Sequence, residues 1–173
     1  GLYYWDSEYD TESFTLDLFE YLAGLPEGTM GTISQHGETE SVAVFASADW
    51  AINDKLTLNL GGRYTYEEKL MTPVGQAFVD ANRMPITPPG DTATAEDDYQ
   101  EFSPRVGMQY QLSDSVMAYA SYSEGFKSGG FFGRITSADN IRGFEPETVE
   151  TYEVGLKSTL WDGRVRLNGA LFS

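Results

Sequence analysis

Acidic side chains at alternate positions are the first residues in this sequence with the chemistry to hold a ligand. They begin near the start of the chain, at Asp6, Glu8, Asp10 and Glu12. Carboxylate oxygens spaced in this way recur in loops that bind hard cations such as Ca²⁺. A second cluster follows later, at Glu96, Asp97 and Asp98. Acids in water are stable without an ion, so we interpret both clusters as solvated loop surface. We therefore predict no metal site and no cofactor.

Catalytic chemistry has little support in the residue types present. His36 is the only histidine, and no residue stands at metal-ligand spacing from it, so we expect a surface position in a loop. The chain has no cysteine, which excludes disulfides, zinc–thiolate sites and thiol nucleophiles. No Ser-His-Asp set, carboxylate pair or other activated nucleophile can be assembled. We predict that the protein is not an enzyme.

The charge balance limits the possible partners. The sequence has 27 acidic and 11 basic residues, a net charge of −16, and no Lys or Arg within residues 1–54. Nucleic acids and anionic membrane surfaces need a basic face, so this charge argues against both as partners. No apolar run approaches the roughly 20 residues of a membrane-spanning helix. The chain starts at Gly1 without an initiator Met, and we expect it to be a piece of a longer protein.

The elements that must position any site are predicted to be strands, because side chains alternate between two types. In residues 55–66, one side carries Leu56, Leu58, Leu60, Gly62, Tyr64 and Tyr66, and the other carries Thr57, Asn59, Gly61, Arg63 and Thr65. Residues 42–50, 102–112, 152–160 and 165–171 alternate in a similar way. Residues 116–127 have aromatics on both sides, so their faces stay unassigned. Pro104 cannot donate a ladder hydrogen bond, which predicts a bulge or an outer strand end there.

Short and long connections between the predicted strands alternate along the chain. Short turns are predicted at 53–54, 113–115 and 162–163, where Asp162-Gly163 is a strong hairpin signal. Long connections are predicted at about 5–40, 70–98 and 128–146. Within the first, a near-helical spacing is compatible with a short loop helix, at Phe14, Leu18, Leu22 and Leu25. The pattern predicts an all-β, antiparallel up-and-down meander of about seven strands, with all short turns at one end.

Two environments could explain the alternating strands. In a soluble barrel or sandwich the apolar side faces a core, and in a membrane barrel it faces lipid while the polar side lines a wet interior. Aromatics gather at strand ends, as in interfacial girdles, at residues such as Trp50, Tyr64, Tyr66, Tyr110 and Trp161. The opposite sides carry Arg and Lys among small polar residues. Long loops without repeated structure are also unusual in soluble domains, so the membrane barrel is favoured.

Several segments resemble the barrel of TonB-dependent outer-membrane receptors. They are Ser103-Pro104-Arg105-Val106-Gly107, Tyr122-Ser123-Glu124-Gly125-Phe126-Lys127, Glu145-Pro146-Glu147 and Tyr152-Glu153-Val154-Gly155-Leu156-Lys157. The stretch VFASADWAINDKLTLNLGGRYTYEEK is similar to the same family. The resemblance spans about residues 41–173, and residues 1–40 are compatible with a strand end and an outer loop. It implies short periplasmic turns, long extracellular loops and a place in the outer membrane of a Gram-negative bacterium.

The resemblance also implies a function and partners. Receptors of this family take up a scarce nutrient such as a ferric siderophore, cobalamin or a glycan, with energy passed through the TonB protein. Their barrels have about 22 strands and enclose an N-terminal plug. We expect residues 1–173 to be a partial barrel domain, without the plug and the closing strands, in contact with outer-membrane lipid. The TonB complex would act through the absent plug.

The candidate ligand-binding residues are basic or aromatic. Arg63 and Arg105, together with Arg164 and Arg166, could attract an anionic ligand or a plug carboxylate, although pairing with Glu101 and Glu153 is the favoured interpretation. In the loop GFKSGGFFGR the candidates are Phe126, Lys127, Phe131 and Phe132. Two alternatives stay open: a passive porin-type or adhesin barrel, and a soluble lipocalin-like barrel that binds a small ligand.

Overall fold

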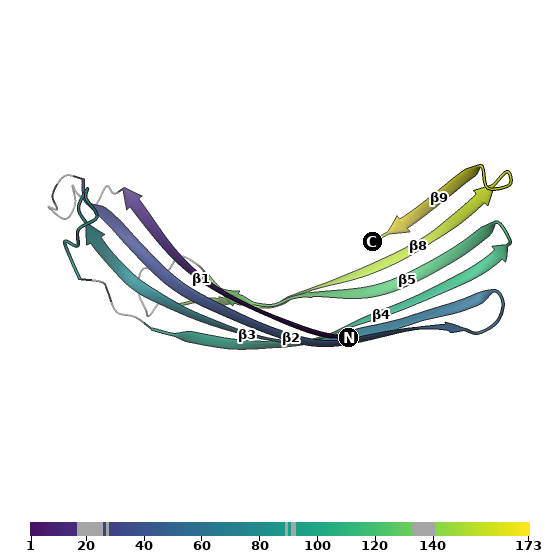
Figure 1. The fold of residues 1–173 in the computed structure, drawn as a ribbon, viewed down its shortest axis with the longest axis horizontal. Helices are drawn as coiled ribbons and strands as arrows, with labels where there is room; N and C mark the ends of the chain where they lie inside the picture. Colours follow the sequence, from purple (N-terminus) through teal and green to yellow (C-terminus); the bar gives the residue numbers. More distant parts are fainter. Residues whose placement is uncertain (17–25, 27, 89, 91–92, 133–140) are drawn as a thin grey trace.

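The chain forms one curved antiparallel sheet and a small second one. The computed structural model describes residues 1–16, 26, 28–88, 90, 93–132 and 141–173. The main sheet contains β1 (Leu2–Leu16), β2 (Met30–Ala51), β3 (Leu56–Val79), β4 (Ala95–Ser113), β5 (Val116–Lys127), β8 (Glu147–Leu160) and β9 (Val165–Phe172). The small sheet pairs β6 (Gly130–Phe131) with β7 (Gly143–Phe144). Figure 1 shows the main sheet as an open, curved wall with β1 and β9 at its edges.

The strand order follows the chain order, which confirms the predicted meander of seven strands. Each strand of the main sheet pairs antiparallel with the next one in the chain, and the β6–β7 hairpin interrupts only the step from β5 to β8. In the part of the chain that the structure describes, no helix is long and apolar enough to cross a membrane.

The three short turns lie together at one end of the sheet, as predicted (Figure 1). In the first, the Asn53 side chain accepts hydrogen bonds from the backbone N–H groups of Lys55 and Leu56, at 2.9 and 3.0 Å. In the last, Arg164 N donates to Trp161 O at 3.1 Å, around Asp162 and Gly163 with φ of 53° and 85°. Two central residues with positive φ form the hairpin turn that Asp-Gly predicts.

The long connections are shorter than predicted, because the strands continue beyond the alternating segments. β1 reaches Leu16 and β2 begins at Met30, so much of the predicted 5–40 loop is a hairpin. Likewise β3 reaches Val79 and β4 begins at Ala95 within the predicted 70–98 loop. These outer strand ends lack a regular alternation of apolar and polar side chains, which removes the period-two signal although the ladder continues. The suggested loop helix falls largely on residues 17–25, outside the described residues.

Pro104 lies within a continuous strand, not at a bulge. It pairs in regular register with Gly62 of β3, so the predicted bulge is wrong. On its other side, however, the ladder between β4 and β5 begins only at Arg105, opposite Ser123. Pro104, which has no N–H, therefore lies just beyond the last residue pair between β4 and β5. From there toward the long-loop end, β4 remains paired with β3, and β5 remains paired with β8.

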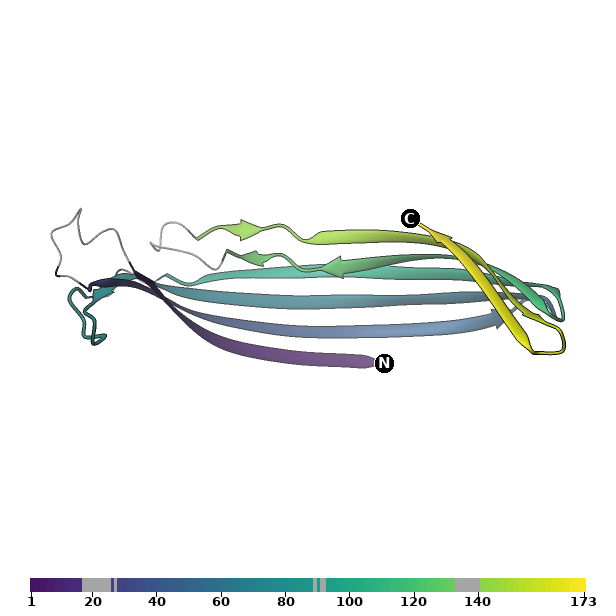
Figure 2. The same cartoon turned by 90° about the horizontal axis from the view of Figure 1, so that it is seen from above.

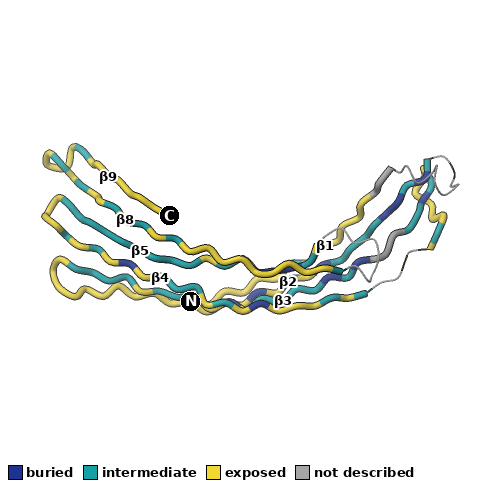
Figure 3. Tube along the Cα trace, turned by 180° about the vertical axis from the view of Figure 1, so that it is seen from behind, coloured by how far each residue is buried: buried dark blue, intermediate teal, exposed yellow. Residues whose placement is uncertain are grey.

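The two faces of the sheet differ in side-chain exposure, and this difference identifies which face is concave and which is convex. On the side of Arg63, Ala43 and Thr65 are 2% and 8% exposed. On the opposite side, Leu60 and Val106 are 42% and 47% exposed. The sheet is curved (Figure 3). Because side chains converge on the inside of a curved sheet and spread apart on the outside, these exposures make the Arg63 side the concave face. Leu60 lies on the convex face and not in a sealed core, which argues against the soluble barrel.

The register also assigns residues 116–127, whose faces the sequence left open. Ser121 pairs with Gly107 and Tyr119 pairs with Gly155, and all of them lie on the concave face. Tyr122 lies on the convex face and contacts Tyr152, with ring centroids 5.0 Å apart.

A girdle of tyrosines marks one boundary of the convex apolar band. The hydroxyls of Tyr66, Tyr122 and Tyr152 donate to acids nearer the long-loop end, namely Glu68, Glu124 and Glu150, at 3.1 to 3.3 Å. Trp50 and Trp161, both well exposed, lie near the short turns. Amphipathic rings at both ends of an apolar band are typical of a protein that spans a lipid bilayer. Figure 2 shows the strands running side by side between these two ends.

Candidate functional site

Three of the six predicted ligand-binding residues line one hollow, which we call the lumen pocket. It has a volume of about 530 Å³, and its walls come from four neighbouring strands and the end of β5. The defining residues are Tyr3 and Trp5 of β1, Arg63 and Glu67 of β3, and Phe126 and Lys127 of β5. The strand curvature brings these residues together, although they are far apart in the sequence.

Arg63 is held by aromatic rings and a hydroxyl. Its guanidinium carbon lies 4.7 Å from the ring centroid of Tyr3 and 5.9 Å from that of Phe45. Its Nε donates a hydrogen bond to Thr65 Oγ1 at 3.0 Å. The predicted pairing with lumen acids is therefore not the arrangement found for Arg63. Stacking on rings fixes the position of a positive charge without neutralising it.

Glu153 also has a different partner from the predicted arginines. Its carboxylate accepts a hydrogen bond from the Tyr119 hydroxyl. Lys157 lies over the Tyr119 ring, 5.0 Å from the centroid. On the concave face of β5 and β8, the Tyr119 side chain therefore contacts both charged groups, Glu153 and Lys157.

The other candidates are distributed differently. Lys127 is exposed and forms an ion pair with Glu147 at 3.7 Å, which at such exposure contributes little stability. Arg105 lines a separate hollow, together with Glu153 and Lys157. Phe131 lies in β6, and the exposed Phe132 contacts the edge of Phe144 with centroids 5.6 Å apart. The structure therefore does not bring Arg105, Phe131 or Phe132 into the lumen pocket.

Beside the lumen pocket lies a contact that the sequence pattern did not predict. After β5 the chain turns onto the concave face, where Ser128 and Gly129 are buried. The Ser128 hydroxyl donates to Glu67, and Lys69 Nζ donates to the Gly129 carbonyl at 2.8 Å. A Cβ on Gly129 would lie 2.6 Å from the Tyr99 ring, so only glycine fits here. We call residues 128–131 the inward segment; its partners lie about 60 residues away in sequence, beyond any local pattern.

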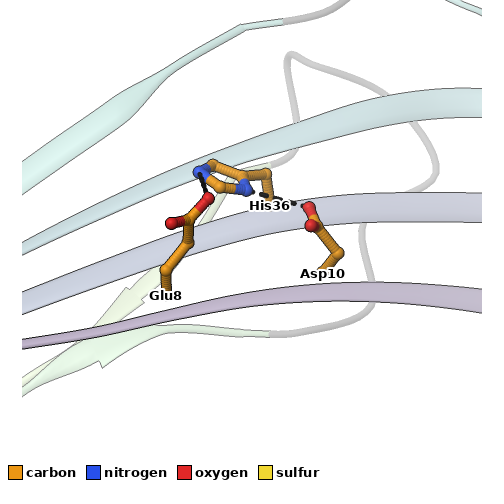
Figure 4. A group of neighbouring side chains, drawn as sticks. All are labelled: Glu8, Asp10 and His36. Atoms are coloured by element: carbon orange, nitrogen blue, oxygen red, sulfur yellow. Dashed lines mark hydrogen bonds and ion pairs between the residues drawn. The ribbon is translucent and has the colours of Figure 1, made fainter.

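A second cluster surrounds His36, on the convex side of the outer hairpin. His36 lies in β2 and not in a loop, so that prediction is wrong. Its Nδ1 is 2.9 Å from Asp10 and its Nε2 is 3.8 Å from Glu8 (Figure 4). Its Nε2 is also 2.9 Å from Glu38, two residues further along β2. Asp10 and Glu8 lie across the β1–β2 ladder, where Asp10 pairs with His36 and Glu8 with Glu38. Register, not sequence spacing, is the signal that could have found them.

The carboxylates change the protonation of the imidazole. Hydrogen bonds from the ring to Glu38 and Asp10 raise the pKa of His36 to about 9. The ring is therefore protonated at neutral pH. Its ion pairs stabilise the hairpin fully below the unfolded pKa of about 6.5, and this contribution is lost as the pH rises through about 9.

A curved antiparallel sheet with an apolar convex face and a charged concave face defines the wall of a transmembrane β-barrel. Comparison with known families identifies the kind of β-barrel. The model of the family "TonB dependent receptor-like, beta-barrel" matches residues 2–173, and the chain belongs to that family. It is a family of transport receptors and not of enzymes, located in the outer membrane of Gram-negative bacteria. The predicted family, location and lack of catalytic function are confirmed.

Several curated proteins are similar to the chain. The ferripyoverdine receptor of Pseudomonas aeruginosa is 27% identical over 99% of this chain and 18% of its own length. The rhizobactin receptor of Rhizobium meliloti is 27% identical over 94% of this chain and 25% of its own length. The ferrichrome outer membrane transporter/phage receptor of Escherichia coli is 30% identical over 76% of this chain and 15% of its own length. The chain thus spans a quarter or less of these relatives.

Solved structures show the same fold. The ferric yersiniabactin uptake receptor FyuA from Yersinia pestis has a TM-score of 0.67 at 14% identity, over 99% of this chain and 28% of that one. The siderophore receptor PiuA from Acinetobacter baumannii has a TM-score of 0.60 at 19% identity, over 80% of this chain and 19% of that one.

Proposed function

We propose that this chain forms part of the wall of an outer-membrane receptor that takes up a ferric siderophore with energy passed through TonB. The observation that carries the proposal is the curved sheet of a TonB-dependent receptor barrel, apolar on its convex face and charged on its concave face. Relatives named as receptors for ferripyoverdine and rhizobactin support the substrate class.

The sheet edges support a larger barrel around this chain. β1 and β9 each have a neighbour on one side only. Unpaired backbone N–H and C=O groups cost several kcal/mol each in hydrocarbon, so these edges need further strands in the membrane. We propose that other parts of the same protein supply the closing strands and the plug domain. In that arrangement the convex face contacts lipid, and the plug connects the receptor to TonB.

We propose the lumen pocket as a contact site for the ferric siderophore. Arg63 presents a positive charge held by stacking, Trp5 presents apolar surface, and Lys127 adds a second positive charge at the rim. This combination suits a ligand with acidic oxygens and flat organic groups. Arg105, Phe131 and Phe132 stand apart from the pocket and are proposed as contacts on the path of the ligand.

The test uses cells that carry or lack the full-length protein. Iron-starved cells receive radiolabelled ferric siderophores of the pyoverdine and rhizobactin types. Uptake should require the protein and should stop when the proton-motive force is collapsed. Uptake that continues without the proton-motive force would support the passive porin instead. Uptake of labelled cobalamin or a glycan, without any ferric siderophore, would overturn the proposed substrate class.

A further inference from the structure

The strongest unexplained feature is the set of side chains around His36, which we call the His36 cluster: Glu8, Asp10, His36 and Glu38. Glu8, Asp10 and His36 each offer a ligand atom, and these atoms lie within 4.8 Å of one another (Figure 4). They come from two adjacent strands, β1 and β2, whose ladder fixes their spacing. The cluster lies on the convex side, away from the lumen pocket, so transport of a ligand through the barrel does not explain it.

The charges of the cluster are unbalanced. Three carboxylates face one imidazole, and Glu8 stands directly opposite Glu38 in the ladder. Like charges at directly opposite positions destabilise a sheet. Residues 1–54 contain no Lys or Arg that could compensate. The next strand brings none to this face either, since β3 places Leu70 opposite Glu38 and Thr72 opposite His36. A divalent cation that replaces the ring proton would reduce this surplus by one charge.

The arrangement of the ring matches that of a metal-ligating histidine. Such a histidine nearly always donates its second ring N–H to a carboxylate, which fixes its orientation and tautomer. Here a carboxylate lies at 2.9 Å from each nitrogen, Asp10 at Nδ1 and Glu38 at Nε2. If Nδ1 binds the metal beside Asp10, Nε2 keeps Glu38 as its carboxylate partner. The half-buried ring is also held between the strands, with 30% of its side chain exposed.

We propose that the His36 cluster binds a first-row transition-metal dication such as Zn²⁺ or Cu²⁺. One imidazole nitrogen and the carboxylates of Glu8 and Asp10 are the ligands. A mixed nitrogen and oxygen set prefers these metals to Ca²⁺ and Mg²⁺, which take oxygen ligands in greater number. The bound ion crosslinks β1 to β2 outside the membrane and so joins the edge of the sheet to its neighbour.

The test measures metal binding by the full-length protein, purified in detergent without a histidine tag. Zn²⁺ is titrated by calorimetry, and Cu²⁺ is followed by electron paramagnetic resonance. The wild type should bind one more Zn²⁺ than His36→Gln, or bind it at least about tenfold more tightly, since loss of even a supporting partner costs about 10- to 100-fold in affinity. The Cu²⁺ spectrum should lose the hyperfine signal of one imidazole nitrogen in the variant. Ser34→Ala, two residues away on the same face, is the matched control and should bind as the wild type does.

A second variant separates the site from chance binding to a surface histidine. Glu8→Gln with Asp10→Asn keeps the histidine and removes both proposed carboxylate ligands. It should weaken Zn²⁺ binding to the same extent as His36→Gln. Equal binding by the wild type and His36→Gln overturns the proposal, and so does a double variant that binds as tightly as the wild type. Heat-modifiable migration on gels shows which variants fold, and either one suffices for the comparison.

Discussion

A charge placed on the convex face at the level of Leu60 tests the orientation of the whole sheet. Leu60 is four residues from Leu56, near the short turns, and six from Tyr66, in the tyrosine girdle. With a rise of about 3.3 Å per residue and a strand tilt of about 40°, these steps correspond to roughly 10 and 15 Å of membrane depth. Leu60 and its cross-strand neighbour Val106 therefore lie close to the bilayer midplane.

Leu60→Arg should destabilise the folded protein by about 2–4 kcal/mol, the cost of an arginine on the lipid face at this depth. This corresponds to roughly a 30- to 700-fold smaller folding constant, because about 1.4 kcal/mol equals a factor of ten. The matched control is Ser121→Arg, at almost the same depth on the concave face. Ser121 pairs with Gly107 and faces Glu153 across the ladder, so its arginine should cost less than about 1 kcal/mol.

The assay is denaturant unfolding of the full-length protein in lipid vesicles, compared for the wild type and both variants. Leu60→Ala measures the part of the effect that comes from lost apolar surface alone. If Ser121→Arg is the more damaging of the two arginine variants, the convex face does not contact lipid, and the assignment of the faces is wrong.

Three further predictions concern the pocket, the inward segment and the last turn. Arg63→Gln, which keeps polarity but removes the charge, should weaken binding of the labelled ferric siderophore about tenfold or more without changing the amount of folded protein. Gly129→Val should displace the inward segment from the Tyr99 ring, detected as faster proteolysis between β5 and β8, whereas Gly125→Val, where a Cβ meets only a backbone oxygen at 3.8 Å, should not. Gly163→Ala should destabilise the protein by about 1–2 kcal/mol in the vesicle assay, because alanine is strained at φ of 85°.

The sequence predicted well wherever the two faces of a strand differ in polarity. Leu58 and Leu60 alternate with Asn59 and Gly61, and this signal gave most of the strands and separated their two sides. Which side is convex came from the structure, because periodicity alone does not distinguish a membrane barrel from a soluble one. The Asp162-Gly163 turn was equally clear, since few other residue pairs accept positive φ at both positions.

Prediction failed at the outer ends of the strands. Beyond Tyr66, both sides of β3 face water or other loops, so Glu67, Glu68 and Lys69 follow one another without a period. The ladder nevertheless continues, because backbone hydrogen bonds do not depend on which side chain is apolar. For a similar reason Glu8 and Asp10 were missed as partners of His36: they belong to another strand, and only the register connects them to it.

Odd and even residue numbers distinguish the concave face of each strand from its convex face, and the two faces are under different constraints. In β2, β3, β4, β5 and β8 the concave face carries odd-numbered residues, among them Arg63, Arg105 and Glu153. In β9 it carries even-numbered ones, because Leu160 pairs with Val165 across the last turn. A one-residue slip in any strand would exchange the faces and place charges in lipid, so the register cannot drift. It follows that ligand preference can change at concave positions within the membrane while the convex positions stay apolar. Under the proposed function, substitutions that alter which siderophore is taken up should therefore fall on one parity in each strand of the main sheet.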